Sequence, residues 1–311
     1  MSVLVAGSVA LDDLKTPFGE RRMVLGGSAV HASVAASFFA GVELVGTAGK
    51  DFPQAHADFL SSRGIGLSGL EIKEGRTFHW EGFYEYDMNT AHTVKTDLNV
   101  LSGFDPVLSP AHKKSTHIFL ANLDPEVQLR IIDQIESPLL IAADTMNYWI
   151  ENKGPALKKM ISRTDIMLLN EMEARQLSEE PNLIKAAAVI LGMGCRYVII
   201  KKGEHGALLF SKGLNFSAPS FPQEQLTDPT GAGDSFAGGF IGYLSAVGLS
   251  GEDHLKKAVV IGSVMASFNV EDFSLERMKT LTRDEIISRY EHIQRCVHFG
   301  GLENNLFTGK E

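Results

Sequence analysis

The sequence predicts an α/β fold in which a mainly parallel β-sheet is covered by helices on both faces, with a small second sheet inserted. Three observations support this prediction: short apolar runs recur along the chain, helical patterns separate most of them, and one region changes to strand alternation. Strands that are buried on both faces read as nearly continuous apolar runs. Their alternation with helices is typical of parallel sheets.

Six apolar runs rich in Val, Ile and Leu are the predicted strands of the main sheet: 3–7, 42–47, 117–121, 139–143, 166–169 and 197–201. Helical patterns lie between them, at 28–40 and at 126–135. We expect Gly41 to end the first of these helices, because glycine readily adopts the backbone conformation found just after a helix.

The region 71–98 has the two-residue period of exposed strands. Aromatic side chains fall on one face and polar ones on the other: Phe78, Trp80, Tyr84 and Tyr86 against His79, Glu81, Glu85 and Asp87. With a further strand from 12–24, this region predicts a small sheet inserted into one domain that spans 1–311. The aromatic face fits sheet core, a homodimer contact, or a surface that stacks on a nucleoside base or covers a sugar.

Composition excludes several classes of protein. The 311 residues carry 29 Lys and Arg against 38 Asp and Glu, a net charge of −9, which argues against a broad basic surface for nucleic acid or anionic membrane. Cys195 and Cys296 are far apart and belong to no CxxC motif, so they predict reduced thiols rather than a disulfide or zinc site. The N-terminal segment lacks the basic residues that open a secretory signal, so we expect a cytoplasmic protein.

Two common nucleotide motifs are also excluded. The segment 46–51 (GTAGKD) contains a Gly-Lys pair, but Leu44 stands where a P-loop needs its first glycine, and Asp51 replaces the required Ser or Thr. The first strand is followed by SVALDD rather than GxGxxG, so a nicotinamide dehydrogenase is not expected.

The strongest chemical motif is DPTGAGD at 228–234, which leads directly into the helical pattern SFAGGFIGYLSAV at 235–247. Glycines allow a tight turn, and the first N–H groups of the helix have no partners within it, so a phosphate can bind there without a basic side chain. The Asp234 carboxylate could accept a proton from a hydroxyl beside that phosphate. The alternative is a tight turn followed by a carboxylate that merely stabilises the helix dipole.

This run is similar to the C-terminal motif of the PfkB carbohydrate kinases, a ribokinase-like family. Three further motifs occur in the family's order: Gly26-Gly27 before a helix, Asn170 to Glu173 as NxxE, and Gly203 to Gly206 as GxxG. Together the four motifs span most of the chain. The resemblance implies a three-layer α/β/α domain with a β-sheet lid and an ATP-dependent kinase that uses Mg²⁺.

The resemblance also implies residue roles on the substrate side. It places four residues at the substrate: Asp12, Gly26, Gly27 and His31. The carboxylate of Asp12 could accept hydrogen bonds from two hydroxyls. His31 stands where the family usually has asparagine, which changes the group offered to a sugar there. Ala10 stands where the family often has a polar residue, so the pattern of hydroxyl groups that the site binds is expected to differ from that of ribose.

On the nucleotide side, the resemblance implies that Asn170 and Glu173 hold water molecules around Mg²⁺, although the same pair could simply cap a helix. It places Lys201 near the phosphates, with Gly203 and Gly206 against the nucleotide. Asn269 is a candidate contact to the base. Asp228 and Thr230 are candidate carbonyl ligands of a monovalent cation such as K⁺.

The predicted reaction is transfer of the γ-phosphoryl group of ATP to a hydroxymethyl group of a small sugar or sugar-like substrate. Asp234 is the predicted general base, and the N–H groups of Gly231, Ala232 and Gly233 form the anion hole. A nucleoside kinase, adenosine-like, is the main alternative, and a non-catalytic regulator on the same fold is another. A phosphorylated sugar is less favoured, because Lys73, Arg76 and Lys95 are scattered. A homodimer through the lid is also predicted.

Overall fold

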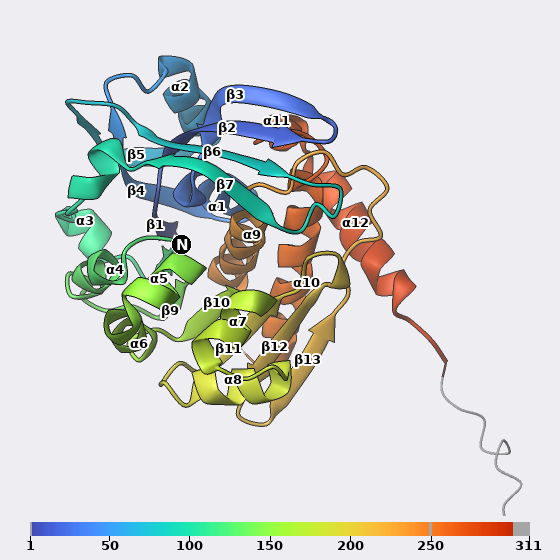
Figure 1. Ribbon diagram of the computed structural model, residues 1–311. Coiled ribbons are helices and arrows are strands. Elements are labelled where there is room, and N and C mark those ends of the chain that lie inside the picture. Colours follow the sequence, from blue (N-terminus) through green and yellow to red (C-terminus); the bar gives the residue numbers. More distant parts are fainter. Residues whose placement is uncertain (1, 249–250, 301–311) are drawn as a thin grey trace, which may run out of the picture.

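The computed structural model describes residues 2–248 and 251–300, which form one large and one small sheet (Figure 1). In spatial order the large sheet contains β13 (Leu214–Ala218), β12 (Ala207–Ser211), β11 (Tyr197–Lys201), β10 (Ile166–Asn170), β9 (Leu140–Ala143), β8 (His117–Leu120), β1 (Ser2–Ala6), β4 (Gly41–Gly49) and β5 (Ile65–Lys73). The strands from β11 to β5 pair in parallel, whereas β12 pairs antiparallel with β11 on one side and with β13 on the other. The predicted mainly parallel sheet is therefore confirmed.

Helices cover both faces of this sheet. One face packs against α1 (Ser28–Ala36), α2 (Gln54–Ser62), α9 (Ala232–Val247), α10 (Glu252–Asn269), α11 (Glu276–Thr280) and α12 (Arg283–Cys296). The other packs against α4 (Pro125–Ile132), α5 (Asn147–Asn152), α6 (Gly154–Ile161), α7 (Glu171–Ser178) and α8 (Leu183–Leu191). The short α3 (Pro110–Lys113) and the 3₁₀ turns η1 (Asn99–Gly103) and η2 (Gly203–His205) complete the described helices. This is the predicted three-layer arrangement.

The apolar runs are continuous because each strand contributes to two cores. In β1, Val3 and Val5 point into the core under α1 and α9, whereas Leu4 points into the core under the opposite helices. All three side chains are fully buried. Within the described residues, no helix is long and apolar enough to cross a membrane.

The small sheet contains β3 (Gly19–Gly26), β2 (Ala10–Thr16), β6 (Phe78–Tyr84) and β7 (Ala91–Asp97), in that order. It lies across one end of the large sheet (Figure 1). The segment predicted as one strand at 12–24 forms two strands joined by a turn. Residues 71–73, predicted to belong to the small sheet, instead end β5 of the large sheet, where they pair with β4.

The prediction for α1 is too long at its C-terminal end. The helix ends at Ala36, and Gly41 begins β4 rather than closing the helix. The Ser37 hydroxyl donates to the Val34 carbonyl at 2.7 Å, so a side chain provides a hydrogen bond to a carbonyl group in the last turn of the helix.

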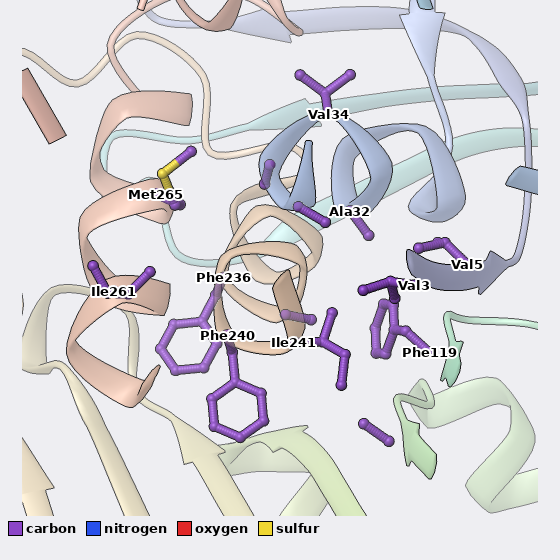
Figure 2. Close-up of a cluster of buried hydrophobic side chains, with 14 of the residues drawn as sticks. Val3, Val5, Ala32, Val34, Phe119, Phe236, Phe240, Ile241, Ile261 and Met265 are labelled. Atoms are coloured by element: carbon purple, nitrogen blue, oxygen red, sulfur yellow. The ribbon is translucent and has the colours of Figure 1, made fainter. Parts of the chain in front are cut away.

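Helices α1 and α9 pack so closely that α9 needs glycine at the contact. A Cβ atom on Gly238 would lie 2.1 Å from the Ala32 carbonyl oxygen, and one on Gly242 would lie 2.9 Å from the Ala36 Cα atom. Figure 2 shows α1, α9 and α10 around the buried side chains that fill the space between them and the sheet. This contact sets the position of the N-terminus of α9, which begins within the DPTGAGD motif.

We expect Gly238→Ala to lower the free energy of unfolding by about 2–3 kcal/mol, because the added methyl must push α1 and α9 apart. Urea denaturation of the purified variant measures this change. Gly154→Ala is the matched control: no atom lies within 4 Å of its Cβ position, so stability should change by less than about 0.5 kcal/mol. A Gly238→Ala variant as stable as the wild type would contradict the tight packing.

Candidate active site

Polar side chains gather where three neighbouring parallel strands end. Asp144 directly follows β9, Asn170 ends β10 and Lys201 ends β11. Asn170 and Lys201 are paired in the sheet register. Because the carboxyl ends of parallel strands meet at one edge, these residues form the floor of a site at that edge.

A buried ion pair lies at the centre of this floor. The Lys201 ammonium is 2.7 Å from Oδ2 of Asp144, and the two side chains are 16% and 6% exposed. Burial alone would lower the pKa of Lys201, but the Asp144 and Glu173 carboxylates outweigh it and raise the pKa. Sequence reasoning missed Asp144, although its position directly after a predicted strand is the signal that pointed to Asn170.

Three carboxylates act electrostatically on this lysine: Asp144 in direct contact, and Glu173 and Asp234 from farther away. Burial first, and then repulsion by Asp144, raises the pKa of Asp234 to about 7, although Lys201 acts in the opposite direction. Burial and Asp144 likewise raise the pKa of Glu173. The site therefore has more negative charge than its protein groups neutralise, which favours a bound cation or a shared proton.

The Asn170–Glu173 pair caps α7 in the structure. The Asn170 side chain accepts from the Glu173 backbone N–H at 2.8 Å, and Glu173 Oε2 accepts from the Asn170 N–H at 2.7 Å. This is the capping box that the sequence left open as an alternative. One carboxylate oxygen, Oε1, has no part in the capping box, so the cap does not exclude a role toward a hydrated cation.

The DPTGAGD loop presents open N–H groups. Gly231 has φ +75°, a left-handed conformation that favours glycine, and it begins α9. The N–H groups of Gly231, Gly233 and Asp234 have no acceptor among the residues that the structure describes. Ala232 does not fit its predicted place in the anion hole, because its N–H donates to the Pro229 carbonyl at 3.1 Å. Lys201 lies below the loop, with Nζ 3.0 Å from the Cβ position of Gly233.

Asn269 lies behind this loop, at the end of α10. Its side chain is fully buried and donates from Nδ2 to the Thr230 carbonyl at 2.7 Å. Its Oδ1 accepts from the Ser235 hydroxyl at 2.9 Å and is 3.0 Å from Nδ1 of His31. The predicted contact of Asn269 with the nucleotide base does not fit, because the amide is enclosed and already bonded.

His31 packs its ring against the anion loop. A Cβ atom on Gly231 would lie 2.3 Å from Nδ1 of this ring, so glycine is required there as well. Burial lowers the pKa of His31 to about 4, so the ring is neutral. With Nδ1 donating to Asn269, the other nitrogen, Nε2, is an acceptor, and it is buried without a partner in the described part of the chain.

Asp12 is the second buried acceptor. It is 4% exposed, and its Oδ1 atom has no partner among residues 2–248 and 251–300. Burial first, and then the carboxylates of Asp228 and Asp13, raises its pKa to about 8. Gly26 approaches so closely that a Cβ atom there would lie 1.9 Å from Asp12 Oδ2, and Gly27 adopts φ +100° against Ser8. Packing therefore requires glycine at both positions, independently of any contact with a substrate.

The small sheet turns one face toward these groups. Trp80 is opposite Asp12 in the parallel pairing of β2 and β6, so both side chains lie on the same face. The Trp80 indole N–H donates to Thr93 at 3.1 Å, and the ring covers Gly82. The Tyr84 hydroxyl is 3.4 Å from the Thr230 hydroxyl, which joins this face to the anion loop. Tyr86, predicted on the same face, lies beyond β6 and is 87% exposed.

The GxxG turn lies at the other end of the site. Gly203 and Gly206 have φ +54° and +83°, so both positions favour glycine. A Cβ atom on Gly203 would lie 3.1 Å from Oδ1 of Asn89, which follows β6 in the small sheet. The small sheet thus reaches from Asp12 to the turn predicted to contact the nucleotide.

Comparison with known proteins identifies the family. The sequence pattern of the pfkB family carbohydrate kinases matches residues 6–277. The chain belongs to this family. A cytidine kinase from Thermococcus kodakarensis is 30% identical over 246 residues, which cover 78% of this chain and 87% of that protein. This pfkB family member is therefore a phosphotransferase that uses ATP and an alcohol group as acceptor.

Solved structures confirm the ribokinase-like fold of this kinase. The nucleoside kinase of Methanocaldococcus jannaschii, an archaeal member of the ribokinase family, has a TM-score of 0.75 at 22% identity, over 94% of this chain and 98% of that one. The nucleoside kinase of Burkholderia thailandensis in complex with ADP-inosine has a TM-score of 0.77 at 18% identity, over 98% and 100%.

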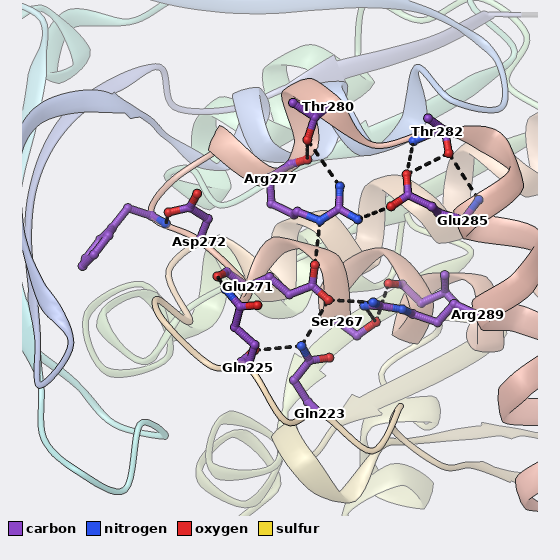
Figure 3. Close-up of polar contacts among 12 residues, drawn as sticks. Gln223, Gln225, Ser267, Glu271, Asp272, Arg277, Thr280, Thr282, Glu285 and Arg289 are labelled. Carbon is purple, nitrogen blue, oxygen red and sulfur yellow. Dashed lines mark hydrogen bonds and ion pairs between the residues drawn. The ribbon is translucent and has the colours of Figure 1, made fainter.

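A charged network fixes the segment that follows α10 in the kinase (Figure 3). Glu271 accepts from Arg277 and from Arg289, each at 2.6 Å, and the Arg289 guanidinium lies 3.5 Å from the centre of the Phe268 ring. Burial would raise the pKa of Glu271, but the bonds from the two arginines lower it. The segment then reaches the anion loop, where the Ser274 N–H donates to Asp228 at 3.0 Å.

We expect Asp12→Asn to make the unliganded kinase more stable, by at least about 1 kcal/mol at pH 8. Because the folded state raises the pKa of Asp12 from 3.8 to about 8, the unfolded chain loses this proton first as pH rises. The carboxyl group therefore destabilises the folded state more and more as pH rises toward 8, and the asparagine variant avoids this cost. Urea denaturation at pH 5.5 and pH 8 measures the difference, which should grow with pH.

The control for this prediction is Asp87→Asn, which changes an exposed carboxylate near the same sheet and should leave stability unchanged at both pH values. An Asp12→Asn variant that is less stable than the wild type at pH 8, or whose difference does not depend on pH, would contradict the assignment of a costly buried carboxylate.

Proposed function

We propose that this kinase transfers the γ-phosphoryl group of ATP to the 5′-hydroxymethyl group of a ribonucleoside. The observation that carries the proposal is the pair of unpartnered buried acceptors, Asp12 Oδ1 and His31 Nε2, beside an open anion loop and under an aromatic sheet face. Unpartnered buried acceptors are costly, so they are expected to meet donors on a ligand.

The acceptor side of the site is proposed to recognise the ribose. Hydroxyl groups would donate to Asp12 Oδ1 and His31 Nε2, which stabilises the ionised form of Asp12 that burial disfavours. His31 is neutral and held in one tautomer by Asn269, so it can only accept at Nε2. An asparagine at this position could turn either its oxygen or its NH₂ group toward the ligand, so His31 narrows what the site accepts.

The small sheet is proposed to be a lid that also contacts the base. Trp80 and Tyr84 offer flat apolar surface beside Asp12, where the base of a bound nucleoside would lie once its ribose meets Asp12. Closing this lid would exclude water, which otherwise competes as the phosphoryl acceptor. The activities named for the relatives, a cytidine kinase and nucleoside kinases, point to the same class of acceptor.

The anion loop is proposed to catalyse the transfer. Asp234 accepts the proton of the 5′-hydroxyl, while the N–H groups of Gly231, Gly233 and Asp234 stabilise the charge on the transferring group. Lys201, 3.0 Å from the Cβ position of Gly233, adds positive charge below the loop. The raised pKa of Asp234 makes it a stronger base than an exposed aspartate.

The donor set of the site fits a hydrated divalent cation. Asp144, Glu173 and Asp234 bring three carboxylates to one lysine, and Asn170 adds an exposed amide at the same sheet edge. Because magnesium keeps several of its water ligands, such an ion would be held mainly through water and nucleotide phosphates. Magnesium bound there would neutralise charge on the phosphates of ATP.

A sugar kinase is the second candidate, because Asp12 and His31 could accept hydrogen bonds from the hydroxyl groups of a free sugar as well as from those of a nucleoside's ribose. The non-catalytic regulator is disfavoured, because a sensor has no need of a carboxylate base next to an anion hole. The homodimer through the lid and the cytoplasmic location stay predictions.

A panel of nucleosides, free sugars and sugar acids, each assayed for acceptor-dependent ADP formation, tests the proposal. We expect at least one ribonucleoside to be used with the highest kcat/KM and to yield its 5′-monophosphate. Preference for a free sugar would replace the proposed acceptor, and no acceptor-dependent ADP with any compound would remove the proposed function.

We expect Asp234→Asn to lower kcat by about 10²–10⁴-fold with little change in ATP affinity, because the variant loses the base but keeps the anion loop. Steady-state kinetics and nucleotide titration measure the two quantities. Asp253→Asn, in the first turn of α10, is the control and should keep its turnover. Near-normal turnover of Asp234→Asn on its best substrate would make the assigned mechanism wrong.

We expect Trp80→Leu to raise the KM for the nucleoside about 5- to 100-fold while leaving the KM for ATP nearly unchanged, because a base loses about 1–3 kcal/mol of stacking. Phe18→Leu is the control: this aromatic residue lies at the exposed turn between β2 and β3 of the same sheet. Equal effects of the two substitutions on nucleoside KM would argue against a base contact at Trp80.

A further inference from the structure

Asn269 connects all the elements that form the catalytic end of the site. It ends α10, and its side chain bonds to Thr230 in the anion loop, to Ser235 in α9 and to His31 in α1. The side chain is fully buried, so no bond is shared with solvent. One amide group therefore links α1, α9 and the loop through hydrogen bonds.

The orientation of this amide is fixed by the chemistry of its partners. The Thr230 carbonyl can only accept, so the NH₂ group must face it, at 2.7 Å. Oδ1 then faces His31 and Ser235, both of which can donate. A flipped amide would place two acceptors against each other in a buried site, which is strongly unfavourable.

Asp228 and Thr230, the residues that the family resemblance offered to a monovalent cation, are bonded within the protein through the Asp228 carboxylate and the Thr230 carbonyl. Asp228 is fully buried, and its Oδ1 and Oδ2 accept from the backbone N–H groups of Thr230 at 2.9 Å and Ser274 at 3.0 Å. The Thr230 carbonyl accepts from Asn269. A cation between these oxygens would be repelled by the partial positive charge of the N–H hydrogens that already bond to them.

Protein groups also hold the neighbouring segment. Ser274 has φ +53°, and its hydroxyl donates to the Leu25 carbonyl of β3. The Val270 carbonyl accepts from the N–H groups of Thr227 at 2.8 Å and Asp228 at 3.3 Å. The Glu271 network in Figure 3 anchors this segment to α12. The junction of loop and segment is thus closed by direct hydrogen bonds.

We infer that Asn269 is a positioning residue that holds the anion loop in place of a bound monovalent cation, so the kinase is active without K⁺. Its NH₂ group supplies the positive end of a dipole to the Thr230 carbonyl, and its oxygen ties the loop to α1 and α9. The inference rests on the proposed function only in taking this loop as the site of the transferring phosphoryl group.

The first test measures the response of the wild-type kinase to monovalent cations. Turnover on its best acceptor is compared in KCl, NaCl and tetramethylammonium chloride at equal ionic strength, and we expect values within twofold. Activation of tenfold or more by K⁺ or Na⁺ would overturn the inference.

Thermal unfolding in the same three salts gives a readout that needs no substrate. A cation that binds the folded state would raise the midpoint with its concentration. We expect no difference between K⁺ and tetramethylammonium. A K⁺-specific rise would overturn the inference even if no acceptor were found, so its failure is separate from that of the proposed nucleoside activity.

The second test uses Asn269→Asp, which is nearly isosteric and keeps an acceptor for His31 and Ser235 but cannot donate to Thr230 when ionised. In tetramethylammonium chloride we expect kcat to fall at least tenfold with less than a threefold change in the KM for ATP. K⁺ should restore part of this loss, because the new carboxylate and the freed carbonyl offer a cation two oxygens. An unchanged kcat, or a loss that K⁺ does not relieve, would overturn the inference.

Asn182→Asp is the matched control for this variant. This control also replaces an amide with a carboxylate at a helix terminus. Asn182 caps α8 by accepting from the N–H groups of Ile184 and Lys185. We expect it to keep the turnover of the wild type in all three salts. A cation response in Asn182→Asp as large as that in Asn269→Asp would also overturn the inference.

Discussion

The close approach of α1 and α9 determines where the chemistry of this kinase can occur. Gly238 brings the two helices together until a Cβ atom would lie 2.1 Å from a carbonyl oxygen of α1. The same approach sets Gly231 against the His31 ring and places the first turn of α9 over Lys201. The open N–H groups of the loop, Asp234 in the first turn of α9 and His31 in α1 all depend on this contact.

Electrostatics adds a second constraint. The chain has a net charge of −9 and binds a polyanionic nucleotide, so it must concentrate positive potential in a small volume. We propose that it does so with backbone N–H groups, one helix terminus and Lys201, rather than with a basic surface. Burial raises the pKa values of Asp12 and Asp234, so the unliganded site carries a cost that a cation or a substrate donor can relieve.

Much of this could be predicted from the sequence. The apolar runs indicated the parallel sheet, because each strand is buried on both faces. DPTGAGD indicated the anion loop, because its glycines and the helix that follows are recognisable within one short segment. Asp144 was missed although it directly follows a predicted strand, and the true position of Asn269 could not be found from the sequence. The role of Asp144 depends on Lys201, which ends β11 on the far side of β10 in the sheet, and that of Asn269 depends on the packing of α10 behind the loop.

The central claim is that a buried carboxylate of raised pKa, Asp234, is the base for phosphoryl transfer. The pH dependence of kcat/KM tests it most directly, because this ratio reports the ionisation of groups in the free enzyme. Between pH 5.5 and 9, we predict a rise with pH that levels off near pH 7–8, where Asp234 and Asp12 become ionised. A ratio that stays constant from pH 5.5 upward would contradict the claim.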